Sequence, residues 1–399
     1  MQKIKNFLQI TLISCVIKTQ KNSWAKIVDN PIKKFSKFQL LNPFVWLRFL
    51  FIHDAGCDKS VLDFKIPRLK YRGHIFFDIN KALELNPNFK RIGLIFCIGI
   101  GDYFFSTQFI ERLKQEFSFL KFDAYVCQNQ DSANNPLVGK LLQINPYFEN
   151  VYYFNGEPYD TKNYNYSQVY EIASKDTLVL PMIHEYNPYI KSRYHALCRT
   201  FMINDKLQNT PLPKIYTDYP ASNNVLEILK NIETKFKQKK YSGIIIFNSV
   251  SRSANHTYPY SSELVQKLIS LNYLILSFDD IDLSSTDFIK ISSKKTDITE
   301  SIKLLSMLTY YRLFFVGVNS VFDSISSALE IKKLTLQIFY DKGIKSVWFP
   351  NVYVLTPKDY PFLPKKNVLI ANKNDYSVSN RGHYIYNVDF VIKQFSKIS

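Results

Sequence analysis

The feature that most constrains this chain is an alternation of short apolar runs with segments of helical periodicity, which begins at residue 91 and occurs twice. Strands separated by helix-length segments are typical of parallel βαβ units. Near-continuous apolar strands also indicate a sheet that is covered on both faces. In the first series the expected strands are residues 91–98, 121–127, 150–155 and 177–183, and the expected helices are 102–117, 135–144 and 192–203.

The second series follows a polar, proline-bearing stretch at residues 209–224, which is typical of a domain boundary. Within this series, Thr296 or Asp297 is a suitable N-cap for the helix that follows. The expected strands are residues 243–248, 273–280, 312–318 and 333–340, and the expected helices are 261–271, 297–308, 320–330 and 387–398.

These patterns predict an α/β protein with two doubly wound domains in tandem. We expect a basic, irregular N-terminal extension over residues 1–88, a first domain over 89–220 and a second domain over 221–399. Ligands of such sheets bind beyond the carboxyl ends of the strands. The functional site is therefore expected in the cleft between the two domains.

The charge balance indicates an anionic partner. The chain has 51 Lys and Arg against 34 Asp and Glu, a net charge of +17. This excess suits nucleic acid, a membrane surface or a phosphorylated substrate, and composition does not choose among them. Hydrophobic residues make up 46% of the chain, which excludes a disordered protein and permits a large core.

The N-terminus carries much of the excess charge. Residues 1–40 contain eight Lys but only Asp29 as an acidic residue, and the apolar segment 42–52 follows them. A basic, aromatic segment of this kind suits the surface of an anionic membrane, but it is equally consistent with a helical extension packed on the main body. No apolar run approaches the roughly 20 residues that span a bilayer.

The cysteines and histidines show no metal-binding spacing and no disulfide framework. We therefore expect no metal site, and reduced thiols in a cytoplasmic protein. The cysteines are Cys15, Cys57, Cys97, Cys127 and Cys198.

The first candidate site is the glycine turn Gly99-Ile100-Gly101-Asp102, between the first expected strand and its helix. Glycines at this place let a ligand approach the backbone, and the following helix N-terminus favours an anion. Asp102 has two interpretations. It is either the N-cap of the helix or a carboxylate that accepts a proton from an acceptor hydroxyl.

Two further candidates follow strands of the second series. At the junction of residues 315–330, Asn319 and Ser320 are suitable caps, and the amides beyond them suit a diphosphate. In the loop after residue 248, Ser249 and Ser251 supply hydroxyls and Arg252 supplies a guanidinium that suits phosphate oxygens. Each stretch alone is also an ordinary strand–helix junction or a solvated loop.

Together, in this order and spacing, the three stretches resemble glycosyltransferase family 9, the ADP-heptose:lipopolysaccharide heptosyltransferases, which have the GT-B fold of two Rossmann-like domains. The family's Gly-Asp turn with a following hydroxyl residue is matched by Gly101, Asp102 and Thr107, although Gln108 replaces the usual Pro. The loop at residues 248–259 is similar to the family's donor-domain loop.

The strongest family pattern, Asp-(Ser/Thr)-Gly followed by His-Leu-Ala, is only partly kept in the helix-opening segment at residues 319–330. Ser320 matches, whereas Asn319 replaces Asp, Val321 replaces Gly and Ser324 stands in place of His. The two replacements at 321 and 324 remove a close backbone approach and a donor-binding side chain, so the donor is open to a sugar other than ADP-heptose.

The resemblance implies an inverting transferase without a metal requirement, with Asp102 as general base and Gly99, Gly101 and Thr107 on the acceptor side. It implies that Ser249, Ser251, Arg252, Asn319, Ser320 and Ser324 bind the donor, a nucleotide-sugar that is a substrate, and that no cofactor is needed. The acceptor would be a phosphorylated glycolipid of a lipopolysaccharide core at the inner face of a membrane.

Three alternatives stay open. The first is a transferase that uses a UDP- or GDP-sugar on another acceptor, including protein. The second is a non-catalytic relative that binds glycan or membrane, which the altered donor motif favours and the intact Gly-Asp turn opposes. Nucleic-acid binding is the third, but it rests on charge alone and lacks a motif, so it is not expected.

Overall fold

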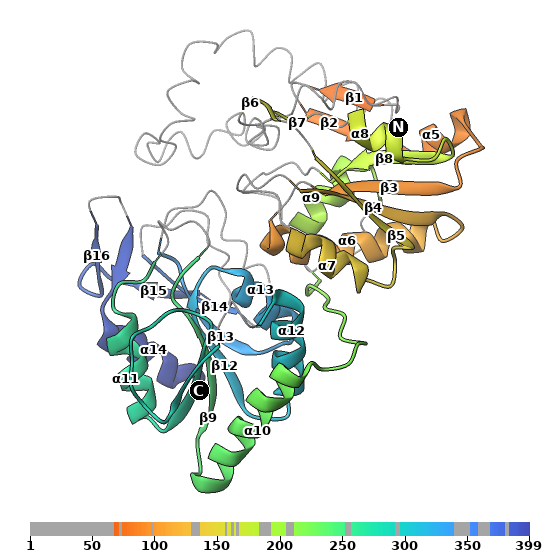
Figure 1. Ribbon diagram of the computed structural model, residues 1–399. Helices are drawn as coiled ribbons and strands as arrows, with labels where there is room; N and C mark the ends of the chain where they lie inside the picture. The colour runs from red at the N-terminus through yellow and green to blue at the C-terminus, as the bar shows by residue number, and fades with distance from the viewer. Residues whose placement is uncertain are drawn as a thin grey trace, which may run out of the picture.

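The computed structural model describes fourteen segments that carry both series of elements (Figure 1). The N-terminal segments that the sequence analysis assigns to a membrane or to packing lie outside these residues, as do Arg252, Cys15, Cys57 and Cys97. Among the described residues, no helix is both long and apolar enough to cross a membrane. The described segments are 68–71, 74–96, 99–128, 136–155, 158–160, 163–164, 167–182, 193–204, 211–251, 257–291, 296–338, 352–357, 368–379 and 383–399.

The first sheet has four parallel strands in the order β5-β4-β3-β8. Its strands are apolar and mostly buried, as the continuous runs predicted. The strands are β3 (Arg91–Phe96), β4 (Lys121–Cys127), β5 (Asn150–Phe154) and β8 (Thr177–Pro181), and the helices are α6 (Ile100–Glu116), α7 (Pro136–Gln143), α8 (Ser167–Ile172) and α9 (Arg193–Thr200). A short antiparallel pair, β6 (Pro158–Asp160) and β7 (Asn163–Tyr164), lies beside it.

The expected irregular extension ends earlier than residue 88. Strands β1 (Arg68–Tyr71) and β2 (His74–Phe77) form an antiparallel pair, and helix α5 (Ile79–Leu85) follows. The Asp78 carboxylate caps α5 by accepting a hydrogen bond from the amide of Lys81 at 2.9 Å. Phe77 is fully buried and its ring stacks on that of Phe201 with centroids 5.4 Å apart. These residues therefore belong to the core of the first half of the structure, the part built around the first sheet. The second half is the part built around the sheet described next.

The second sheet has seven parallel strands in the order β11-β10-β9-β12-β13-β14-β15. Its strands are β9 (Gly243–Asn248), β10 (Tyr273–Ser277), β11 (Phe288–Lys290), β12 (Leu313–Val318), β13 (Lys332–Leu336), β14 (Val352–Pro357) and β15 (Val368–Ala371). Its helices are α10 (Asn223–Gln238), α11 (Ser261–Ser270), α12 (Ile298–Met307), α13 (Val321–Ala328) and α14 (Val388–Ile398), and β16 (Tyr376–Val378) pairs with β17 (Tyr384–Tyr386).

Both faces of the second sheet are buried because successive side chains of a strand point to opposite faces. On β9, Ile244 and Ile246 belong to the apolar core that also holds buried residues of α10, α12 and α13. Ile245 and Phe247 belong to a second core with buried residues of α11 and α14. This is the two-sided cover that the apolar runs predicted.

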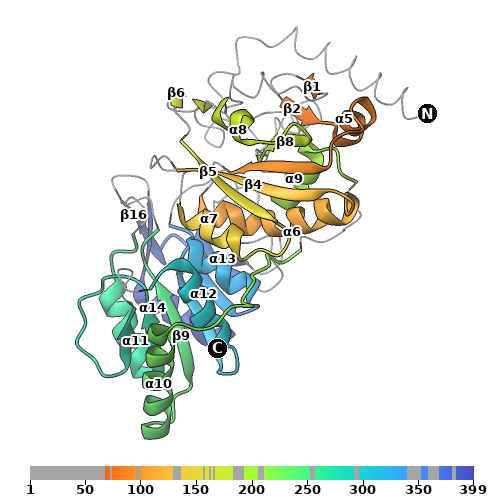
Figure 2. The ribbon, with the colours of Figure 1, turned by 45° about the vertical axis from the view of Figure 1, so that its right-hand side comes forward.

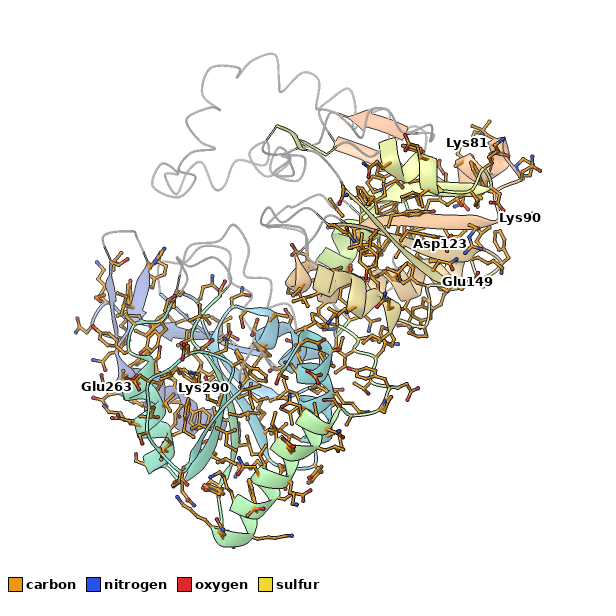
Figure 3. All side chains as sticks on the ribbon, viewed as in Figure 1. Lys81, Lys90, Asp123, Glu149, Glu263 and Lys290 are labelled. Atoms are coloured by element: carbon orange, nitrogen blue, oxygen red, sulfur yellow. The ribbon has the colours of Figure 1, made fainter. Side chains whose placement is uncertain are left out.

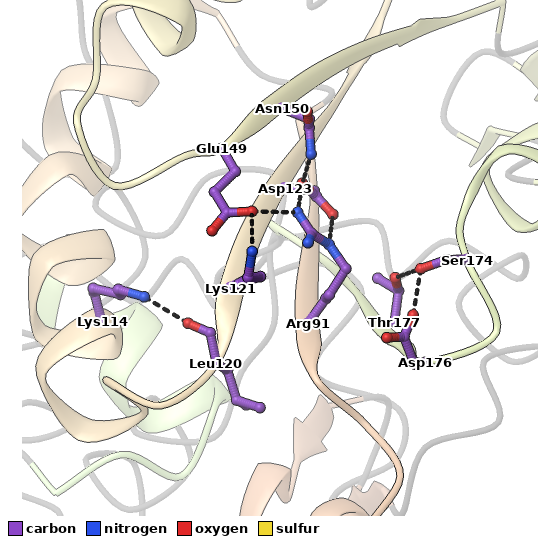
Figure 4. Close-up of polar contacts among 10 residues, drawn as sticks. All are labelled: Arg91, Lys114, Leu120, Lys121, Asp123, Glu149, Asn150, Ser174, Asp176 and Thr177. Carbon is purple, nitrogen blue, oxygen red and sulfur yellow. Dashed lines mark hydrogen bonds and ion pairs between the residues drawn. The ribbon is translucent and has the colours of Figure 1, made fainter.

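A network of polar side chains ties the amino ends of β3, β4 and β5 together. The Arg91 guanidinium donates two hydrogen bonds to the Asp123 carboxylate, from Nε and Nη2, each at 2.5 Å (Figure 4). Asn150 donates to the same carboxylate at 2.8 Å, and Glu149 accepts from Arg91 at 3.2 Å. Asp123 and Glu149 lie close together at this end of the sheet (Figure 3). The hydrogen bond to Asp123 raises the pKa of Arg91, although burial opposes it.

An extended segment joins the two halves and is fastened at both ends. On the first half, the Thr107 hydroxyl accepts a hydrogen bond from the Lys214 amide at 2.8 Å, and the Gln108 amide donates to the Leu212 carbonyl at 2.5 Å. On the second half, the Tyr219 hydroxyl donates to the carbonyl of Thr299 at 2.8 Å. Only a few residues lie between these two sets of hydrogen bonds, so the path of the connecting segment is restricted.

The two halves also touch directly. Helix α6 packs against α13, and α7 packs against α12, an arrangement that both ribbon views show (Figure 1, Figure 2). One cluster of buried apolar side chains continues from the first sheet through these helices to one face of the second sheet. At its edge, Lys140 Nζ of α7 lies 2.6 Å from Asp297 Oδ2, the N-cap of α12.

Asp297 pairs with Lys140, and it also forms a capping box with Glu300 at the start of α12. The sequence analysis left Thr296 or Asp297 as the cap of this helix, and the structure assigns that position to Asp297. Burial raises the pKa of Asp297, but hydrogen bonds from Lys140 and Thr299 outweigh burial and lower the pKa to about 2.

We expect Asp123→Ala to lower the free energy of unfolding by about 3 kcal/mol, because it leaves the largely buried Arg91 charge with the exposed Glu149 carboxylate in place of its buried partner. Lys121→Ala, which removes an exposed cation that pairs with Glu149, is the matched control. Urea denaturation followed by circular dichroism measures both. Equal denaturation midpoints for the two variants would contradict a structural role for the Asp123 network.

The Lys140–Asp297 pair should make stability depend on pH. Because the pKa of Asp297 is lowered from 3.8 to about 2 on folding, its contribution is present above pH 3.8 and is lost as the pH falls towards 2. Lys140→Met should lower the free energy of unfolding by about 1 kcal/mol at pH 7, after allowance for solvent screening. The difference from wild type should shrink steadily between pH 4 and pH 2, and a difference independent of pH would contradict the ion pair.

Candidate functional site

The turn that carries Asp102 opens helix α6 directly. Gly99 is the N-cap of this helix with extended backbone angles, and having no side chain it makes no side-chain capping hydrogen bond. Asp102 is therefore not the N-cap: it is the third residue of the helix, and its carboxylate lies in the first turn. The interpretation of Asp102 as the cap residue is wrong, because the helix begins two residues earlier than the sequence pattern indicated.

Asp102 is partly buried. Its Oδ2 atom lies 3.9 Å from the position that a Cβ on Gly99 would take. A Cβ on Gly101 would meet nothing within 4 Å. A side chain at Gly99 would thus contact the Asp102 carboxylate, whereas one at Gly101 would not touch the described residues.

Thr107 also lies on α6, but its hydroxyl has a structural role. It is fully buried, donates to the Phe104 carbonyl at 2.9 Å, and holds the interdomain segment through Lys214. The hydroxyl at this position therefore fastens the two halves together and is occupied by the protein itself. Its place on the acceptor side stays a prediction.

The second candidate site is the junction of β12 with α13. Ser320 is the N-cap of α13, but its side chain makes no capping hydrogen bond, and its buried Oγ atom has no hydrogen-bond partner among the described residues. Asn319 is partly exposed, and Ser324 is buried one turn into the helix. The amides of the first turn of α13 thus begin at a hydroxyl that the protein does not use.

Val321, which follows the N-cap Ser320, has an apolar packing role in this junction. It is partly buried and packs against the apolar cluster that joins the two halves. The ring of the neighbouring Phe322 stacks on Phe278, with centroids 3.9 Å apart. Apolar packing therefore occupies the positions that directly follow the cap.

The third candidate site begins where β9 ends. Asn248 and Ser249 are buried, and both donate hydrogen bonds to the Asp279 carboxylate, at 2.5 Å from Asn248 Nδ2 and 2.9 Å from Ser249 Oγ. The Ser249 amide donates to it as well. Ser251 is partly buried. Ser249 therefore shapes the start of the loop, and its hydroxyl is already engaged.

The base of this loop is closed. Val250 pairs with Thr257 in an antiparallel bridge, and the Tyr258 amide donates to the Ser249 carbonyl at 2.9 Å. Helix α11 then begins after Tyr260, which is its N-cap.

The ends of β9 and β12 bring the last two candidate sites to one edge of the sheet. Gly317 pairs with Asn248 in the strand register. A Cβ on Gly317 would stand 2.1 Å from the Asn248 carbonyl oxygen, so only glycine permits this close approach. Ser249 and Asn319 follow these paired strands, and α13 packs against α6, which carries Asp102. The second and third candidate stretches therefore share one edge of the sheet, and the helix of the second contacts the helix that carries Asp102.

The sequence analysis missed Asp279. Burial raises its pKa, and the hydrogen bonds from Ser249 and Asn248 oppose that rise. The sign in the sequence was a carboxylate at the carboxyl end of a parallel strand, two residues after the end of β10. Among the described residues, no group of three or more His, Cys, Asp or Glu side chains is arranged to hold a metal ion.

Comparisons by sequence and by structure give different results. No protein-family model matches the chain, and no curated protein matches its sequence. By structure, the chain is similar to a glycosyl transferase of family 9 from Veillonella parvula DSM 2008, with a TM-score of 0.51 at 10% identity, covering 77% of this chain and 97% of that chain. E. coli ADP-heptose lps heptosyltransferase II matches with a TM-score of 0.47 at 10% identity over 77% of this chain and 98% of that chain.

The chain therefore has the two-sheet fold of family 9 glycosyltransferases. The predicted fold class, two tandem Rossmann-like α/β domains of the GT-B type, is confirmed, and so is the structural resemblance to that family. An identity of 10% supports the fold alone.

Proposed function

We propose that this protein is a glycosyltransferase that moves a sugar from a nucleotide-diphosphate donor to a surface glycan. The observation that supports it best is the contact between the two helices of this fold that carry the candidate groups. These are the partly buried Asp102 beside two glycines on α6, and the uncapped amino end of α13 at Ser320.

In this proposal Asp102 is the general base. Its carboxylate accepts the proton of an acceptor hydroxyl while the oxygen forms a bond to the anomeric carbon of the donor sugar. The bond from that carbon to the diphosphate oxygen breaks, and the electron pair leaves with the diphosphate. A single displacement of this kind inverts the configuration at the anomeric carbon.

The leaving diphosphate carries negative charge away from the sugar. The amides in the first turn of α13 and the Ser320 hydroxyl would receive that charge, which is the contribution a metal ion makes in other transferases. Ser251 and Arg252 would add contacts from the loop after β9. The resemblance to family 9 favours a heptose-like sugar and a lipopolysaccharide core acceptor, and Val321 and Ser324 leave a UDP- or GDP-sugar as the second candidate.

We expect one nucleotide diphosphate among ADP, UDP and GDP to raise the melting temperature of the protein, with or without Mg²⁺, because a ligand of the folded state stabilises it. Asp102→Asn should keep that shift and lose transfer by about 100-fold or more, since the amide cannot take the proton. Asp389→Asn is the matched control, since it alters an exposed carboxylate in the first turn of α14.

Each outcome of this experiment has a separate meaning. Near-normal transfer by Asp102→Asn contradicts the general base. The absence of a shift with any nucleotide in the wild type contradicts the donor site and favours a non-catalytic relative. A shift that requires Mg²⁺ contradicts the metal-independent mechanism. UDP or GDP in place of ADP selects the second candidate donor.

We also propose that the basic N-terminal extension binds the anionic surface of the membrane that carries the acceptor. The eight Lys of residues 1–40 supply the charge, and the apolar segment 42–52 suits the interface. The full chain should sediment with vesicles that contain phosphatidylglycerol and release them at high salt. Equal binding to purely zwitterionic vesicles would contradict an electrostatic contact.

A further inference from the structure

A buried ion pair lies beneath the amino end of helix α13. Lys333 of β13 and Asp323 of α13 both have an exposed fraction of 0%, and Lys333 Nζ lies 2.7 Å from Asp323 Oδ1. The same ammonium donates to the Asp323 carbonyl at 3.0 Å and to the Ser327 hydroxyl at 2.5 Å. Thr335 donates to Asp323 Oδ1 at 2.6 Å. The carboxylate is therefore held by side chains of the sheet.

The place of Asp323 in the helix makes its charge important. It is the third residue of α13, in the turn that begins at Ser320. A carboxylate in the first turn favours the helix because it lies near the free amides, but the same charge repels an anionic ligand that approaches those amides. Without an opposite charge, Asp323 would therefore weaken the binding of a diphosphate at this helix end.

Lys333 supplies that opposite charge. Burial lowers the pKa of Lys333, and the Asp323 charge and hydrogen bond offset part of this effect. A buried ion pair contributes little net stability, because the cost of removing two charges from water is comparable to their attraction. The need for stability thus gives no reason for a charged pair at this position.

A second observation points to a ligand at the same sheet edge. Asn248 is 3% exposed, and its Oδ1 atom has no hydrogen-bond partner within the described residues. Asn248 pairs with Gly317, two residues before Asn319. The buried Ser320 Oγ atom is likewise without a partner there. A buried acceptor and a buried hydroxyl thus remain unsatisfied beside the first turn of α13.

We propose that Lys333 is a positioning residue for the donor: it cancels the charge of Asp323 and ties the first turn of α13 to β13, so that this turn accepts the diphosphate of a nucleotide-sugar. This inference rests on the proposed function. It assigns Lys333 no contact with the substrate, because the side chain is enclosed between helix and sheet.

Isothermal titration with a nucleotide diphosphate and with its parent nucleoside tests the proposal, with the nucleotide chosen by the melting-temperature experiment. Lys333→Met should weaken diphosphate binding by about tenfold or more, because the Asp323 charge is then unopposed. Nucleoside binding should change by less than about twofold, since the nucleoside carries no phosphate. The double variant Asp323→Asn with Lys333→Met removes both charges and should restore diphosphate binding.

Asp323→Asn alone keeps the protein testable if Lys333→Met does not fold. With the cation retained and the carboxylate gone, diphosphate affinity should equal or exceed that of the wild type. A tenfold loss in Asp323→Asn, or a double variant as weak as Lys333→Met, would overturn the proposal. An equal loss of nucleoside and diphosphate binding would show that Lys333 acts through packing alone.

The proposed function fails separately from this inference. A wild-type protein that binds none of the nucleotides contradicts the donor site itself. A wild-type protein that binds one of them, with Lys333→Met unchanged in diphosphate affinity, leaves the donor site in place and overturns only the role of Lys333.

Discussion

The apolar contact of α6 and α7 with α13 and α12 is the interaction on which the rest of the structure depends. It joins the core of the first sheet to one face of the second in a single cluster of buried side chains. The connecting segment is short and is fastened to both halves, so it limits their separation, while the helix contact sets how they meet. The ion pair of Lys140 and Asp297 borders the same contact.

This contact also explains where the candidate chemistry lies. Helices α6 and α13 each begin close to the strand that precedes them, and each brings its amino end to a strand terminus. Asp102 lies in the first turn of α6 and Ser320 is the N-cap of α13, and neither N-cap residue makes a side-chain capping hydrogen bond. Packing the two helices together thus joins the helix that carries this carboxylate to the helix that begins at Ser320, the two groups on which the proposed transfer rests.

Sequence reasoning succeeded where an apolar run was continuous. The expected strands at 121–127 and 243–248 match β4 and β9 residue for residue, because every residue of these runs except the first of β4 is buried. It missed α10, whose surface is rich in Lys and Glu and whose buried residues are only Val225, Leu229 and Ile232. It also missed β14 and β15, which continue the second sheet beyond β13.

The candidate site was predicted in part for a similar reason. Glycine turns and strand–helix junctions are visible as local patterns, so Asp102 and Ser320 could be selected from the sequence. The partners of buried polar groups come from distant segments: Ser249 bonds to Asp279, and Asp323 bonds to Lys333. No local pattern indicates which hydroxyl is engaged and which is left without a partner.

The sequence by itself determined the class of fold, because the period of its apolar residues decides which elements form and a repeated strand–helix order decides that the sheets are parallel. It also determined the candidate turns, since glycine and small polar residues mark them. Only the tertiary structure decided what each polar residue does. The Thr107 hydroxyl holds the segment that joins the two halves, and the buried Lys333 pairs with Asp323, since burial and pairing depend on neighbours that the chain brings together only on folding.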